Sequence, residues 1–130
     1  MNKLLVFLCS SLLYFTASAK LQAIEPGSVA TGSMKMGDAV VEITLEKIAG
    51  GKAYFTYSIN THTVDLSQID FKKDARLIYD GKEISPLEAK EPSGHHAKGS
   101  LVFSIPQDAK AIKIILKNVG KTNERVFEWQ

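Results

Sequence analysis

Histidine and methionine are the residue types in this sequence whose chemistry points most directly to a bound ion. His62 lies in one irregular segment, His95 and His96 are adjacent in a second, and Met34 and Met36 precede the first predicted strand. Imidazole suits copper, zinc and nickel, whereas thioether sulfur favours Cu(I). This set therefore predicts a transition-metal site with copper as the leading ion and zinc as the alternative.

Asp65 is the carboxylate nearest to a histidine in the sequence, so it is predicted to ligate the ion or to orient a histidine ring. The alternative is a loop cap, in which its oxygens accept backbone N–H groups.

His62 could equally fasten its loop through a hydrogen bond to Asp65 or to a carbonyl. Neighbours in extended chain point to opposite sides, so His95 and His96 share one ion only if Gly94 or the following turn rotates the backbone.

Met34 and Met36 also have a second interpretation. With Lys35 between them, they fit a hydrophobic edge strand whose two sulfur atoms lie on one side. The metal prediction and the edge-strand prediction both remain open at this point.

Catalysis has little support in the sequence. Ser67 and Ser100 lack a recognisable nucleophile context, and there is neither a glycine-rich phosphate loop nor an HExxH helix. We therefore expect a binding protein with no catalytic residues.

Length and charge limit the alternatives further. The 130 residues suffice for one ordinary domain, and 45% hydrophobic residues with 23% charged ones are typical of a globular chain. The formal net charge is +2, and the basic residues are scattered. A nucleic-acid surface needs a concentrated basic face, so nucleic acid is not expected as a partner.

The first 19 residues predict an export signal. Lys3 supplies the positive start, residues 4–15 form an apolar run, and Ala17 and Ala19 make an A-x-A cleavage site. The run is shorter than the ~20 residues of a membrane span. Leu8 precedes Cys9 where a lipoprotein would carry a small residue, so we expect cleavage without lipidation. The mature protein would be periplasmic or extracellular, free of cysteine and without a membrane span.

The mature chain is predicted to be an extended arm over residues 20–37 followed by one β domain over residues 38–130. Apolar and polar residues alternate with the period of two that is typical of half-buried strands. Turn signals such as Gly50-Gly51 and Asp80-Gly81 separate these segments. The predicted strands lie near residues 41–46, 54–59, 75–79, 83–87, 101–105, 112–116 and 124–129. About seven short strands favour an antiparallel, immunoglobulin-like β-sandwich, with a partly open barrel as the alternative.

Three stretches carry a resemblance: NTHTVDL at 60–66, SGHHAKGSLVF at 93–103 and RVFEW at 125–129. They resemble a group of small exported β-sandwich domains of poorly defined function, which implies that the two histidine loops form one site. More loosely, exported β-sandwiches with His and Met ligands are similar to periplasmic copper-binding proteins, although their His/Met spacing is absent here. The competing hypothesis is a protein-interaction or scaffold module of the cell envelope that binds no metal.

Overall fold

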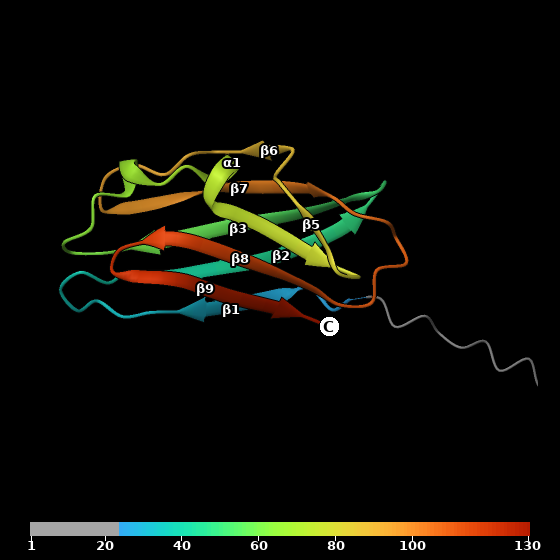
Figure 1. Cartoon of the computed structure of the whole chain (residues 1–130), viewed down its shortest axis with the longest axis horizontal. Helices are drawn as coiled ribbons and strands as arrows, with labels where there is room; N and C mark the ends of the chain where they lie inside the picture. The colour runs from blue at the N-terminus through green and yellow to red at the C-terminus, as the bar shows by residue number, and fades with distance from the viewer. Residues whose placement is uncertain (1–23) are drawn as a thin grey trace, which may run out of the picture.

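The computed structural model describes residues 24–130; the predicted signal peptide, with Cys9, lies outside the described residues. These residues form two antiparallel sheets packed face to face (Figure 1). The all-β prediction is confirmed, and two separate sheets favour the sandwich over the barrel. No helix in the described part of the chain is long and apolar enough to cross a membrane.

The first sheet, sheet A, has the strand order β1-β2-β3-β7-β6. Its strands are β1 (Gly27–Thr31), β2 (Val40–Ala49), β3 (Lys52–Asn60), β6 (Glu88–Ala89) and β7 (His96–Ser104). The second, sheet B, has the order β5-β4-β8-β9. Its strands are β4 (Ala75–Tyr79), β5 (Lys82–Ile84), β8 (Ile112–Val119) and β9 (Thr122–Trp129). A 3-10 turn, η1 (Leu66–Gln68), and a one-turn helix, α1 (Phe71–Asp74), join β3 to β4.

The alternation in the sequence places the core between the sheets. Phe55 of β3 is fully buried, and its ring lies 5.8 Å from that of Phe103 in β7 and 5.0 Å from that of Trp129 in β9. Phe127 is also fully buried. The two C-terminal aromatic residues are therefore core residues, and large apolar rings of this kind dominate the burial energy of a small domain.

The strand predictions differ from the structure mainly at the sheet edges. Residues 24–130 form nine strands rather than seven, and residues 27–31 of the predicted arm are β1, paired with β2 from Gly27↔Leu45 to Thr31↔Val41. This edge strand is mostly exposed, so it carries no apolar alternation to reveal it. β5 (Lys82–Ile84) covers only the start of the predicted 83–87 strand, because Pro86 has no N–H for a ladder.

The sandwich has two dissimilar ends. One, the loop end, holds the β1–β2 loop, the segment after β3, the segment before β7 and the β8–β9 turn. Backbone and side-chain bonds join them: Gly37 N–H donates to Thr63 Oγ1 (2.7 Å), and Lys121 N–H donates to the Gly37 carbonyl (2.9 Å). The opposite end, the turn end, holds the β2–β3 and β4–β5 turns and the C-terminus.

Candidate functional site at the loop end

The two histidine segments are neighbours at the loop end. Thr61 N–H donates to the His95 carbonyl (2.9 Å), and Leu66 N–H donates to the Gly94 carbonyl (3.1 Å). The β3–β7 ladder ends on the pair Asn60↔His96. Residues at least 28 positions apart in sequence are thus joined by main-chain bonds.

His95 is held by the neighbouring loop. Its Nδ1 lies 3.1 Å from the Val64 carbonyl oxygen. A carbonyl can only accept, so Nδ1 carries the hydrogen and donates it, and in the neutral ring Nε2 then has a free lone pair. A ring fixed through Nδ1 with Nε2 available is the usual arrangement of a metal-binding histidine.

His96 lies on a different surface. Its Nδ1 donates to Asn60 Oδ1 (2.7 Å), because the Asn60 amide nitrogen is already directed to Ser58 Oγ (3.2 Å). Ala97, the next residue, is buried, so strand alternation turns His96 to the outer face of sheet A. The two histidines therefore do not face one ion. The His95 ring contacts the neighbouring loop, and the His96 ring contacts Asn60 on the outer face of sheet A.

Asp65 acts as a cap. Its side chain precedes η1 and accepts from Ser67 N–H (3.0 Å) and Ser67 Oγ–H (2.6 Å), both on Oδ1. The hydrogen bonds from Ser67 hold the pKa of the Asp65 carboxyl below its usual range, and the nearby charge of His95 adds to this in a smaller degree. Asp65 is thus an ionised, exposed carboxylate beside His95.

Thr61, rather than His62, fastens the first histidine loop. Thr61 is fully buried; its hydroxyl donates to the Asp38 carbonyl (2.8 Å) and accepts from Val64 N–H (3.0 Å). His62 is exposed and takes part in none of the hydrogen bonds found among residues 24–130. The loop shape therefore does not depend on the His62 ring, which leaves that ring available.

The predicted edge strand at Met34 and Met36 is wrong. Both residues lie in the bends and turn of the β1–β2 loop, since the chain must reverse here between two antiparallel strands. Met36 is 82% exposed, and Met34 is 36% exposed. The bond from Gly37 to Thr63 brings the residue after Met36 against the residue after His62.

A buried arginine holds this methionine loop in place. Arg125 of β9 has a side chain only 3% exposed, and its Nη2 lies 2.6 Å from Asp38 Oδ1. The guanidinium also donates to the carbonyls of Ala39 and Val119 (3.2 Å each). Asp38 further accepts from Ser33 N–H (2.9 Å). The hydrogen bonds from Arg125 hold the pKa of the Asp38 carboxyl far below its usual range, with the Ala39 N–H the next cause.

His62, His95, Asp65 and Met36 therefore lie in loops of the loop end that are bonded to one another, whereas His96 lies on the adjacent face of sheet A. Within residues 24–130, no group of three or more His, Cys, Asp or Glu side chains is close enough to hold a metal ion. A site here would therefore combine the two imidazoles with a thioether, with Asp65 as a nearby charge. Thr61, Asp38 and Arg125 shape these loops but were not predicted from the sequence, because no periodicity or motif marks such long-range partners.

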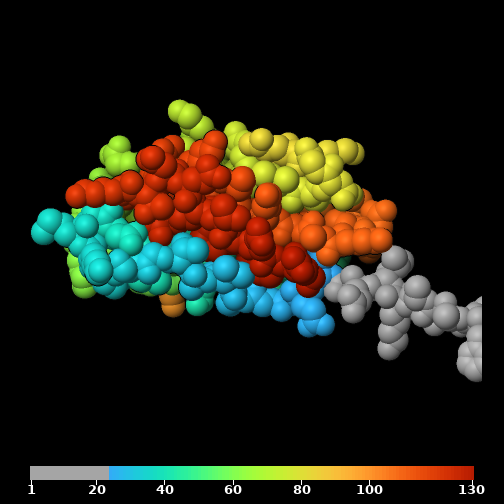
Figure 2. All heavy atoms as spheres, turned by 60° about the horizontal axis from the view of Figure 1, so that its bottom comes forward, coloured from blue at the N-terminus to red at the C-terminus, as the bar shows by residue number. Residues whose placement is uncertain are grey.

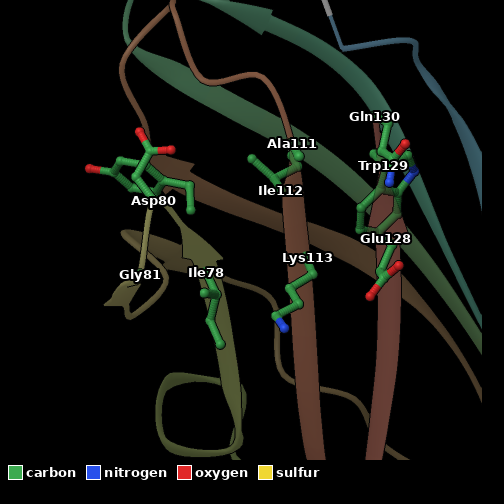
Figure 3. A pocket seen from close by; sticks show the side chains of 10 residues that line it. Ile78, Asp80, Gly81, Ala111, Ile112, Lys113, Glu128, Trp129 and Gln130 are labelled. Carbon is green, nitrogen blue, oxygen red and sulfur yellow. The ribbon is translucent and has the colours of Figure 1, made fainter.

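The turn end carries a separate, open cavity of about 380 Å³. Figure 3 shows its wall along β8 and β9, with the β4–β5 turn on the other side. Ile112 and Trp129 line it, together with the charged Asp80, Lys113 and Glu128. None of the predicted metal-binding residues lies there.

Comparisons of the chain with family models, with curated proteins and with solved structures find no match. The geometry alone therefore carries the functional argument.

Proposed function

We propose that this protein is an exported, single-domain β-sandwich of immunoglobulin-like type that binds a transition metal ion, copper, at the loop end. The observation that carries the proposal is the hydrogen bond from His95 Nδ1 to the Val64 carbonyl, which leaves Nε2 free and fixes the ring. The role is binding, not catalysis, in the periplasm or outside the cell.

The remaining ligands follow from the loop contacts. His62 is exposed in the loop against which His95 is bonded, and Met36 lies beside that loop through the Gly37–Thr63 bond. Imidazole nitrogens with a thioether favour copper over harder ions, and zinc remains the second ion for the two imidazoles. The exposed Asp65 carboxylate would supply negative charge near the ion.

Calorimetric titration of the purified protein with Cu(II) and with Zn(II) at pH 7 tests the proposal. We expect His95→Ala and His62→Ala each to weaken metal binding by about tenfold or more, because loss of a side chain that only supports a ligand already costs ~10–100-fold in affinity. His96→Ala is the matched control, since it removes the neighbouring imidazole from the other surface. If His95→Ala and the wild type bound Cu(II) and Zn(II) with equal affinity, the proposal would be overturned.

Proton competition gives an independent check. Coordination requires neutral imidazole, and histidine in general titrates near ~6.5, so Cu(II) affinity should fall steeply between about pH 7 and pH 5. Met34→Ala and Met36→Ala should instead matter for Cu(I), because thioether is the soft ligand.

A protein-interaction module of the cell envelope is the second candidate. It is favoured by the fact that Nδ1 of both His95 and His96 already bonds a loop or a strand, so both rings have a structural role without metal. Thermal unfolding separates the candidates: a ligand that binds only the native state raises the melting temperature with its concentration. No shift at saturating Cu(II) or Zn(II) would support the interaction module.

A further inference from the structure

The outer face of sheet B carries an ordered arrangement of charge. Alternate residues of β8 and β9 point away from the core, because their neighbours Ile112, Ile114, Leu116, Phe127 and Trp129 are buried. On β8 the outward residues read Lys-Ile-Lys, and on β9 they read Glu-Val-Glu. These six residues, called the β8–β9 face below, are Lys113, Ile115, Lys117, Glu124, Val126 and Glu128.

The register aligns unlike charges across the two strands. Lys113 pairs with Glu128, Ile115 with Val126, and Lys117 with Glu124. Val126 is 43% exposed, which is large for an apolar side chain. In Figure 2 the atoms of these last strands (red) form a continuous surface between the β4–β5 hairpin and the β1–β2 segment.

The charges of this face form no close ion pair among residues 24–130. Across residues 24–130 the ion pairs within 4.0 Å are Arg76–Glu83 and Arg125–Asp38. Neither lysine of β8 is therefore in a close ion pair with the glutamate opposite it. The face therefore presents two lysines on β8 and two glutamates on β9. The apolar pair Ile115–Val126 lies midway along both strands.

We propose that the β8–β9 face binds the same face of a second copy of this chain. A two-fold axis parallel to the strands, running between β8 and β9, would place β8 of each copy over β9 of the other. Lys113 and Lys117 would then meet the partner copy's two glutamates, and Ile115 would meet Val126. An interface that pairs one patch with itself in this way is the usual form of a homodimer.

The alternative two-fold arrangements do not satisfy the charges. An axis across the strands would place β8 over β8, so that lysines would face lysines and glutamates would face glutamates. Like charges opposed across an interface repel each other, which selects the axis along the strands. Sheets packed face to face at about 10 Å with nearly aligned strands are a common arrangement, so the geometry needs no change of fold.

Sedimentation velocity of the purified protein over a range of concentrations tests the dimer. We expect reversible dimerisation that weakens as salt is added, because exposed ion pairs are screened. Lys113→Glu with Lys117→Glu should weaken dimerisation by at least about tenfold, and so should Glu124→Lys with Glu128→Lys. An equimolar mixture of these two double variants should form a heterodimer, since each β8 again meets an oppositely charged β9.

Two further variants keep the experiment decisive. The variant that exchanges all four charges retains the unlike pairs within each chain and should dimerise like the wild type, which guards against loss of folding in the double variants. Lys52→Glu with Lys98→Glu makes the same charge change on sheet A and should leave dimerisation intact. A wild-type protein that stays monomeric at all concentrations, or a mixture that does not associate, would overturn the proposal; neither result bears on the metal site.

Discussion

Two of the contacts that hold the loop end together differ in their surroundings, and they are called the buried and the exposed attachment below. The Arg125–Asp38 contact ties the β1–β2 loop to β9 from inside the protein, with the guanidinium buried. The bond from His95 to the Val64 carbonyl ties two loops to each other from outside, on an exposed ring. A buried charge must keep its partner, whereas an exposed neutral bond exchanges readily with water. The first attachment is thus suited to stability and the second to ligand exchange.

The largest effect should come from adding a methyl group beside the buried attachment. Gly32 has φ +94°, and a Cβ there would overlap the Ala39 carbonyl oxygen and the Arg125 guanidinium. We expect Gly32→Ala to lower the free energy of unfolding by roughly 4 kcal/mol, measured by urea denaturation, from backbone strain plus loss of these bonds. Gly50→Ala is the control: its φ is +59° but nothing lies within 4 Å, so a loss of only about 1 kcal/mol is expected. Similar losses for both would mean that the contact is unimportant.

The second-largest loss of stability should come from removing the negative charge of the buried Arg125–Asp38 attachment. Asp38→Asn leaves the Arg125 guanidinium without a carboxylate, which should cost about 2–3 kcal/mol of unfolding free energy; the value stays low because Asp38 is 26% exposed. Glu83→Gln breaks the exposed pair with Arg76 (3.8 Å) and should cost less than about 1 kcal/mol. If the two substitutions were equally mild, burial would not distinguish these pairs.

Low pH should weaken the Arg125–Asp38 attachment. The folded-state pKa of Asp38 is lower than its value in the unfolded chain, near ~3.9, so this carboxylate stabilises the fold above that pH. The contribution is lost as the pH falls below about 4 toward the folded pKa. We expect the wild type to lose more stability than Asp38→Asn between about pH 5 and pH 2. Parallel stability curves for the two proteins would contradict this.

The exposed attachment should give the smallest effect. His95→Ala removes one hydrogen bond at the surface, so we expect a loss below about 1 kcal/mol. The local effect should be clearer: the Leu66 amide, bonded to the Gly94 carbonyl, should exchange its hydrogen faster in His95→Ala than in His96→Ala. Equal exchange in both variants would show that His95 does not fasten the loops.

The sequence predicted what depends on local periodicity. The alternation of Phe55, Tyr57 and Ile59 marked β3 correctly, and Asp80-Gly81 marked the β4–β5 turn. β1 was not predicted because an exposed edge strand is specified by its neighbour and not by its own pattern. The outward direction of His96 follows from strand alternation once Ala97 is known to be buried.

The details of the candidate site could not be predicted in this way. The partner of His95 is a carbonyl 31 positions away, and Arg125 contacts Asp38 across 87 positions. Such contacts exist only once the two sheets have packed. Nothing in the sequence around Arg125 distinguishes this buried residue from the exposed charged residues of the chain. Sequence spacing therefore identified the histidine loops but not the side chains that shape them.

The link between β1 and β9 has a consequence for the order of folding. Glu25 N–H donates to the Gln130 carbonyl (3.1 Å), and Trp129 Nε1 donates to the Gly27 carbonyl (2.8 Å). Glu25 and Gly27 therefore gain these hydrogen-bond partners only when the last two residues of the chain are in place. Synthesis proceeds from the N-terminus onward, so these two hydrogen bonds form only after β9 has been made. A nascent chain that stops short of residue 129 lacks both partners.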